Sequence, residues 1–218
     1  MLDEDTSRHV VQVLRMQAGE ELHLTDGKGN LLFCIISEAD KKHGVAEVKE
    51  VRYREQGTRG VTVAISLLKN TNRFEWFLEK ATEIGVREII PLICDRTEKE
   101  KFRYDRMQAI CISAMLQSQQ SWLPALHEPL RFDHLMRRPF DDTEKLIAHC
   151  DNGEKKSLSN HQITKSANHL ILIGPEGDFT QPEIEQALHQ GYQPVSLGDT
   201  RLRTETAGVV AAALLCNL

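Results

Sequence analysis

The chain has 218 residues, of which 40% are hydrophobic and 27% are charged, with a net charge of −5. This composition is typical of a globular protein of one or two domains, and it excludes a wholly disordered or collagen-like chain. Bulk charge also excludes a strongly basic nucleic-acid binder, but a local basic face is compatible with an acidic protein.

Signals for membrane insertion, secretion and metal binding are missing from the sequence. No apolar run approaches the roughly 18 residues that span a bilayer, and the acidic residues 1–5 contain no signal-peptide core. The five cysteines form no C-x-x-C pair, and the histidines form no H-E-x-x-H motif. We therefore expect a cytoplasmic protein with reduced thiols, no membrane contact and no metal ion.

The first part of the chain predicts a small β-rich domain with one helix. Val10, Val13 and Leu14 have helical spacing in residues 9–14, and Gly19 ends this segment. Alternating or apolar strands are predicted at 21–24, 31–36 and 45–51, with the turn D-G-K-G-N between the first two. A polar stretch at 52–60 marks a boundary, which divides the chain into domains 1–59 and 60–218.

The order of predicted elements changes after residue 60, where strands alternate with helices. This order predicts βαβ units and a parallel sheet that is covered on both faces. The polar segment 151–167 is interpreted as a surface excursion. The predicted strands are 61–68, 88–93, 145–149, 169–173 and 194–197; the helices are 73–84 with Gly85 as C-cap, 104–119, a capped helix from Thr180 to Gly191, and 204–215.

Two glycine loops follow strands of this predicted sheet. In I-G-P-E-G-D-F at 173–179, two glycines allow close approach to a ligand at the carboxyl edge of the sheet. A tight turn without a ligand explains that segment equally well. In S-L-G-D-T-R-L-R-T-E-T-A at 196–207, Arg203 stands at a helix N-terminus against the helix dipole. This placement favours a role in binding an anion or stabilising negative charge, with a surface salt bridge as the alternative.

Two basic segments complete the set of candidate sites. Lys69 and Arg73 follow the strand 61–68, at the same edge as the glycine loops. Residues 95–106 interleave five basic residues with Phe102 and Tyr104, as an RNA-facing loop does. Four acidic residues dilute that segment, so its composition favours a solvated loop.

Together these segments resemble the 16S rRNA (uracil-N3)-methyltransferase family of the SPOUT class, over nearly the whole chain. I-G-P-E-G at 173–177 and L-R-T-E-T-A at 202–207 are specific in combination, and residues 69–86 add to the match. The resemblance implies an α/β SPOUT domain with a C-terminal trefoil knot and a parallel sheet, preceded by a PUA-like RNA-binding β-barrel. The knot follows from the family alone, because general topology rules argue against it.

The resemblance also implies a homodimer that uses S-adenosylmethionine to methylate N3 of a uridine in 16S rRNA or the small ribosomal subunit. Arg203 is our first choice for stabilising charge on the uracil, and Glu176 or Glu205 for the general base. The cofactor-binding candidates are Ile173, Gly174, Gly177, Leu197, Gly198, Leu202, Arg203 and Thr206. The RNA-binding candidates are Arg8, Arg15, Arg52, Arg54, Lys69 and Arg73.

The sequence departs from the family pattern in three places. Asp178 stands where the family continues with a second glycine, which adds a carboxylate beside the site. The segment L-Q-S-Q-Q at 116–120 lacks the glycine and arginine of the family, which puts a contact from that loop in doubt. The opening strand of the family has no counterpart before the first predicted helix, so we expect an incomplete barrel.

Three other interpretations are compatible with these residues. One is another SPOUT RNA methyltransferase with a different target, because the cofactor loops are shared across that class. A second is a non-catalytic RNA-binding ribosome-assembly factor on the same fold, which cofactor binding would distinguish. The third is a metabolic α/β enzyme whose motif matches are accidental.

Overall fold

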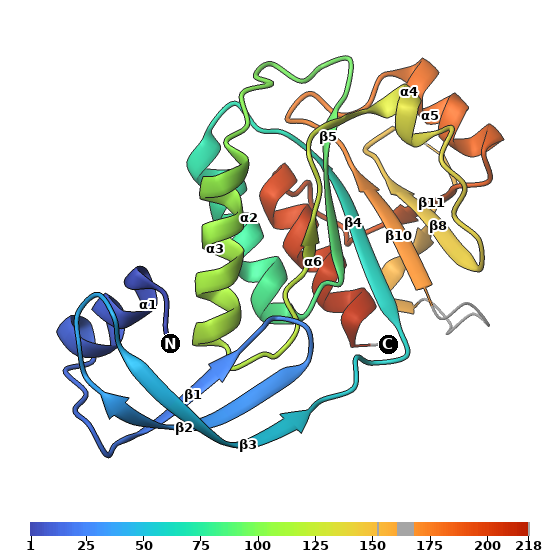
Figure 1. Ribbon diagram of the computed structural model, residues 1–218. Helices are drawn as coiled ribbons and strands as arrows, with labels where there is room; N and C mark the ends of the chain where they lie inside the picture. The colour runs from blue at the N-terminus through green and yellow to red at the C-terminus, as the bar shows by residue number, and fades with distance from the viewer. Residues whose placement is uncertain (152, 161–167, 218) are drawn as a thin grey trace. The chain divides into compact units, whose positions relative to one another are not determined.

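The computed structural model describes residues 1–151, 153–160 and 168–217 (Figure 1). The chain divides into two compact units, Met1–Gln56 and Gly57–Leu218. Within the described ranges, no helix is long and apolar enough to cross a membrane.

The first unit contains an antiparallel sheet in the order β1-β2-β3. Its strands are β1 (Glu21–Thr25), β2 (Asn30–Glu38) and β3 (Val45–Tyr53). The predicted turn joins β1 to β2, with Gly27 and Gly29 at φ 68° and 95°. Three strands in a linear order leave β1 and β3 as edges within residues 1–56, so they form an open sheet, in keeping with the incomplete barrel that the sequence analysis expects.

The helix of this unit starts earlier than the sequence analysis predicts. α1 (Glu4–Arg8) continues into a π-helical segment, His9–Val13. The Asp3 side chain caps α1 by accepting the Thr6 N–H at 2.8 Å, a start signal that the apolar spacing did not reveal. Val13 and Leu14 are 65% and 51% exposed, so Val10 alone of the three predicted apolar positions is buried.

The second unit is built on a parallel sheet in the order β6-β5-β4-β10-β8-β11-β9, with β7 paired to β5. Each strand pair in the described residues is parallel, as the sequence predicts. Its strands are β4 (Gly60–Ser66), β5 (Glu88–Ile93), β6 (Ala125–Leu126), β7 (Leu130–Arg131), β8 (Thr143–Ala148), β9 (Lys156–Ser157), β10 (Asn168–Ile173) and β11 (Gln193–Ser196). The sequence analysis missed β6, β7 and β9, because a strand of two residues carries no periodic signal.

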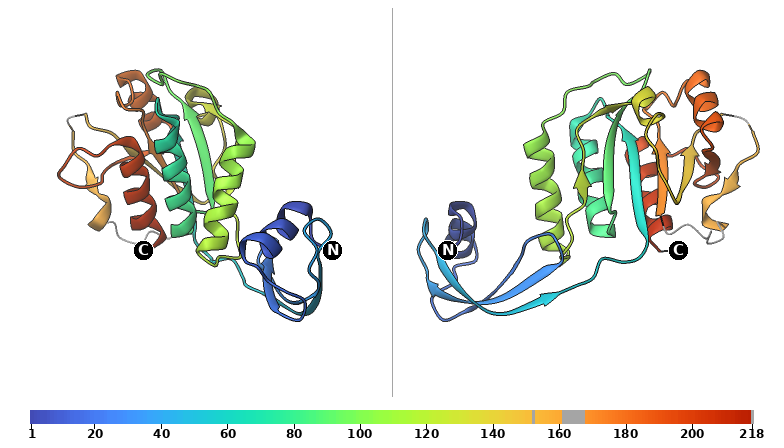
Figure 2. Two further views of the ribbon diagram at one scale, coloured as in Figure 1. Left: turned by 90° about the vertical axis from the view of Figure 1, so that its left-hand side faces the viewer. Right: turned by 45° about the vertical axis from the view of Figure 1, so that its right-hand side comes forward.

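Helices cover both faces of this sheet (Figures 1 and 2). α2, α3 and α6 share one buried cluster with β4, whereas α4 and α5 pack on the opposite face. The helices of this unit are α2 (Thr71–Ile84), α3 (Tyr104–Gln117), α4 (Phe132–Leu135), α5 (Gln181–His189) and α6 (Thr204–Cys216).

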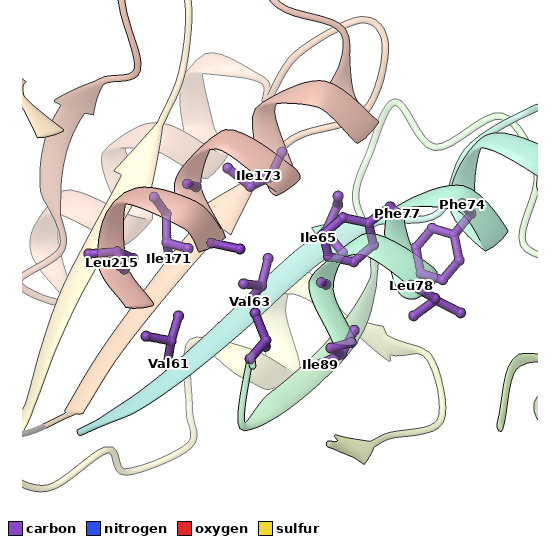
Figure 3. Packing of buried hydrophobic residues seen from close by; sticks show 14 of the residues in the cluster. Val61, Val63, Ile65, Phe74, Phe77, Leu78, Ile89, Ile171, Ile173 and Leu215 are labelled. Carbon is purple, nitrogen blue, oxygen red and sulfur yellow. The ribbon is translucent and has the colours of Figure 1, made fainter. Parts of the chain in front are cut away.

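The larger core lies between β4 and the α2–α3–α6 layer (Figure 3). Val61, Val63 and Ile65 point into it on alternate positions of β4, and Ala64 faces the other layer. Phe77 of α2 is fully buried in the same cluster. Burying one such large side chain contributes about 1.5–3 kcal/mol, so this layer anchors both α2 and α6 to the sheet.

The predicted helix signals are confirmed. Gly85 ends α2 in the left-handed region at φ 96°. Thr180 and Glu183 form the capping box of α5. The Glu183 carboxylate also accepts the Asp95 N–H at 2.9 Å, which ties the start of α5 to the end of β5.

Most described residues of the predicted surface excursion 151–167 are exposed, but the segment is also tied to the second unit by a strand pairing and one buried side chain. β9 pairs with β11, and Leu158 beside it is fully buried in the larger core. Leu158 anchors the polar segment to the core, although an isolated apolar residue produces no periodic pattern in the sequence. Residues 152 and 161–167 lie outside the described ranges.

Gly208 provides a test of the α6 packing. A Cβ at this position would lie 2.7 Å from Phe77 Cε2 and 2.8 Å from Ile65 Cδ1. Overpacking costs about 1–3 kcal/mol, whereas alanine gains at most about 1 kcal/mol of helix propensity. We expect Gly208→Ala to lower the free energy of unfolding in denaturant titrations. Gly57→Ala is the control, because a Cβ there meets nothing within 4 Å, and an equal loss in both variants would contradict this account.

Candidate active site

A cavity of about 660 Å³ opens at the carboxyl ends of β8, β10 and β11. Its lining comes from the ends of these three strands with the loops that follow them, from the start of α6, and from Arg73 near the start of α2. Its volume lies within the range of small-molecule sites in proteins. The parallel pairing of the three strands therefore creates one site from segments far apart in the sequence.

The loop after β10 makes a tight turn that leaves little room for a side chain at its start. A Cβ on Gly174 would lie 3.1 Å from the backbone nitrogen of the buried Phe179. Asp178 adopts φ 65°, a left-handed conformation that Asp tolerates better than most residues. Its Oδ2 accepts the Cys150 N–H at 2.6 Å, so this departure from the family pattern fastens the loop to the segment after β8.

Arg96 holds the same loop from the other side. Its Nη1 donates to the Gly177 carbonyl at 2.7 Å and reaches the Phe179 carbonyl at 3.4 Å. A Cβ on Gly177 would lie 3.3 Å from Arg96 Cδ, so the glycine lets the arginine cross the loop closely. Sequence reasoning missed this role, because no local signal pairs residues more than eighty positions apart.

The loop after β11 approaches the cavity with its backbone. Gly198 adopts φ 145°. The Ser196 hydroxyl donates to the Gly198 carbonyl at 3.1 Å and accepts the Gly198 N–H at 3.3 Å. Arg203 precedes the first residue of α6, is exposed, and makes no side-chain capping bond. Arg203 lines the cavity, so the start of α6 places this residue beside the site.

The two candidate carboxylates differ in environment. Glu176 is exposed, and its Oε1 accepts the Lys69 N–H at 3.1 Å, which joins the β10 loop to the chain after β4. Glu205 is only 6% exposed, in the first turn of α6. Its Oε1 lies 3.6 Å from Arg73 Nε, and its Oε2 is buried without a hydrogen-bond partner in the described part of the chain.

His149, at the end of β8, is a cavity residue that sequence reasoning missed. Burial lowers the pKa of its imidazole, and Lys155 lowers it further, while Asp178 and Asp151 act in the opposite direction. Neither ring nitrogen has a hydrogen-bond partner among the described residues. Its position as the last residue of the predicted strand 145–149 was the available signal, since this strand ends at the same edge.

A second cleft of about 590 Å³ adjoins the first cavity. Arg73 and Glu176 line both spaces. The remaining residues of the second cleft are Lys69, Asn70, Thr71, Asn72, Glu98 and Lys99.

The structure brings most predicted site residues of the second unit together. Within the described residues, Gly177, Glu205 and Thr206 adjoin the first cavity in sequence without lining it. Lys69 lines only the second cleft. The predicted residues that line the first cavity are Arg73, Ile173, Gly174, Glu176, Leu197, Gly198, Leu202 and Arg203.

The other predicted RNA-binding residues, Arg8, Arg15, Arg52 and Arg54, belong to the first unit. Arg8 pairs with Glu4 at 2.8 Å on the exposed face of α1. Arg52 pairs with Glu50 at 2.6 Å and lies 4.4 Å from the centroid of the Phe33 ring.

Comparisons with known proteins agree with this architecture. A family model described as an RNA methyltransferase domain matches residues 55–216, and one described as an RNA methyltransferase PUA domain matches residues 2–49. The crystal structure of a probable rRNA-methyltransferase from Porphyromonas gingivalis is 38% identical with a TM-score of 0.90, over 97% of this chain and 90% of that chain.

Two further relatives carry a more specific description. The crystal structure of ribosomal RNA small subunit methyltransferase E from Neisseria gonorrhoeae, bound to S-adenosyl methionine, is 30% identical with a TM-score of 0.88, over 97% of this chain and 88% of that chain. The protein of that name from Synechocystis is 32% identical, over 94% of this chain and 68% of its own length.

Fold, site and matches together define an RNA methyltransferase with an N-terminal PUA domain. The chain belongs to the ribosomal RNA small subunit methyltransferase E family. The family resemblance inferred from the sequence is thereby confirmed.

The lowered pKa of His149 predicts a pH effect on stability. The unfolded chain, with a histidine pKa of about 6.5, binds a proton there more readily than the folded chain. The free energy of unfolding should therefore fall as the pH drops below about 6.5. We expect His149→Gln to lose part of this decrease in denaturant titrations at pH 5 and pH 8. His134→Gln is the control on an exposed ring, and identical pH slopes in both variants and the unmodified chain would refute the prediction.

Proposed function

We propose that this protein transfers a methyl group from S-adenosylmethionine to N3 of a uridine in 16S rRNA, on the RNA or the small ribosomal subunit. The observation that carries the proposal is the cavity formed by the two glycine loops after β10 and β11, in a chain of this family. The N3 target comes from the resemblance of the combined segments 173–177 and 202–207 to the uracil-N3 enzymes.

The residues of the first cavity fit this cofactor. Ile173, Leu197 and Leu202 offer apolar surface for an adenine ring, and Gly174 and Gly198 leave backbone groups accessible to its polar edges. Charged side chains for a ribose or an amino-acid group come from the same wall, as Lys155 and Asp178 line it. We assign cofactor binding to Ile173, Gly174, Gly177, Leu197, Gly198, Leu202, Arg203 and Thr206. When bound, S-adenosylmethionine supplies an electrophilic methyl group.

The protein's own residues must make N3 of uracil nucleophilic. The N3–H bond has to break, with the proton passing to a base and the electron pair staying on the ring. Arg203, at the cavity without a capping partner, stabilises the resulting charge on the uracil oxygens. Glu176 and Glu205 are the candidate bases. A base must lie within hydrogen-bond reach of the N3 proton, and this favours Glu176, because it lines both the first cavity and the second cleft.

We assign RNA binding to the PUA-like domain, residues 1–59, and methyl transfer to residues 60–218. Paired uracil hides N3, so the target must be unpaired or extruded. Backbone phosphates then contact the basic candidates of both domains. As the resemblance implies, we further propose a cytoplasmic homodimer.

The proposed trefoil knot is supported by the strand order. β11 lies between β8 and β9, and β9 belongs to the connection from β8 to β10. The chain then continues from β11 into α6, whose Ala211 and Leu215 share the larger core with Leu158 of that connection. A terminal helix that returns past this connection is what threading requires.

The function is tested by incubating the protein with methyl-labelled S-adenosylmethionine and small ribosomal subunits that lack N3-methyluridine. We expect label in N3-methyluridine after digestion to nucleosides. Label in another nucleoside would favour another SPOUT methyltransferase. Cofactor binding without label would contradict the proposed target, and the absence of both would favour a non-catalytic RNA-binding factor.

The role of Arg203 predicts a selective loss. Removing one donor that stabilises transition-state charge typically costs about 100-fold to 1000-fold in rate, so Arg203→Ala should slow single-turnover transfer by about 100-fold or more. The unfolding midpoint should stay near that of the unmodified chain, because the side chain is exposed. Arg137→Ala removes the same charge from an exposed site on another element. Transfer at the rate of this control would exclude the role of Arg203.

A further inference from the structure

The second cleft contains residues that the proposed function treats as a base and as general RNA contacts, but that function assigns the cleft itself no ligand. It shares Arg73 and Glu176 with the first cavity, so a molecule in one space lies next to a molecule in the other. Methyl transfer needs such a neighbour, because orientation of two reactants supplies a large share of the barrier reduction.

The chemistry of this cleft suits a nucleotide. Three cations, Lys69, Arg73 and Lys99, line it together with two carboxylates and the polar residues 70–72. Lys69 Nζ pairs with Glu98 at 2.6 Å, and Lys99 Nζ donates to Thr71 at 3.3 Å. These contacts leave Arg73 as the cation that faces both spaces.

Glu205 holds Arg73 at this junction from a buried position. The side chain of Glu205 is 8% exposed and that of Arg73 is 39% exposed, so the pair joins the protein interior to the cleft. Arg73 Nε lies 3.6 Å from Oε1, and Oε2 is buried without a hydrogen-bond partner among the described residues. A small shift of the guanidinium would make a two-bond pair, and leaving a buried charged oxygen without a partner is costly.

We propose that the cleft lined by residues 69–73, Glu98, Lys99 and Glu176 binds the target uridine, and that Arg73, positioned by Glu205, contacts one carbonyl oxygen of its base. This inference rests on the proposed function and deepens it by assigning the nucleotide subsite. Loss of the N3 proton spreads negative charge onto the two flanking oxygens of the ring. A guanidinium can direct two planar donors at one of these oxygens from the side away from N3, which leaves the nitrogen open to the methyl group, whereas a lysine ammonium acts as a point charge.

The first test compares Arg73→Gln and Arg73→Lys with the charge-matched control Arg137→Gln. Single-turnover transfer is measured at saturating RNA, alongside the Kd values for S-adenosylmethionine and for RNA. We expect Arg73→Gln to slow transfer by about 100-fold or more, with the cofactor Kd near that of the control. Arg73→Lys should recover only part of the rate, because the charge stays while the paired donors are lost.

Two outcomes of this test would overturn the assignment. Unimpaired transfer at saturating RNA with a weaker RNA Kd would make Arg73 a phosphate contact. A rise in the cofactor Kd that explains the slower transfer would make it a cofactor contact. If the unmodified chain gives no labelled RNA at all, the proposed function fails; if it does and Arg73→Gln transfers equally well, only the subsite assignment fails.

The second test asks whether Glu205 acts through Arg73. We expect Glu205→Gln to slow transfer in the unmodified chain and to add little in the Arg73→Gln background, because interacting residues are not additive. Effects that multiply would show that Glu205 acts independently, for example as the base. Thermal unfolding accompanies each variant, and if Glu205→Gln does not fold, the Arg73 variants decide the proposal by themselves.

Discussion

Parallel pairing of β4, β10, β8 and β11 is the constraint on which the site depends. Parallel strands end at one edge, so the loops after β8, β10 and β11 meet although they are separated by dozens of residues in the chain. The segment after β4, which leads into α2, reaches the same edge and supplies Arg73. Residues from across the second unit thereby line the first cavity and the adjoining second cleft.

The cavity wall is fixed before any ligand arrives. Asp178 fastens the β10 loop to Cys150, Arg96 bonds two of its carbonyls, and Glu176 accepts a backbone N–H of Lys69. A wall held in this way keeps its backbone groups in place, which lowers the ordering cost of binding. The tight packing of Gly174 against Phe179 serves the same end.

Charge is arranged differently in the two spaces. Among the cations that line the second cleft, Lys69 pairs with the exposed Glu98, and such exposed pairs contribute little to stability. Arg73 differs because its partner Glu205 is buried. Arg73 is therefore restrained by a side chain of the protein interior, whereas Lys69 is restrained only by another solvent-exposed side chain.

Much of the second unit was determined by the sequence alone. The helix signals at Gly85 and Thr180, the alternation of strands and helices, and the two glycine loops depend on local backbone preferences, which residues express wherever they stand. The same local logic failed at the first helix, where it weighted Val13 and Leu14 over the cap at Asp3. It also did not reveal Leu158, a buried anchor in an otherwise exposed polar segment.

Only the tertiary structure decided which distant residues meet. Three placements depend on contacts across the sheet edge that no spacing in the chain records. They are the contact of Arg96 with the loop after β10, the position of His149 in the cavity, and the pairing of Glu205 with Arg73. The order of the strands, and hence the sharing of Arg73 and Glu176 by two spaces, arises from packing of the whole unit. Local sequence therefore determined the elements and their loops, whereas long-range packing chose the partners of each functional side chain.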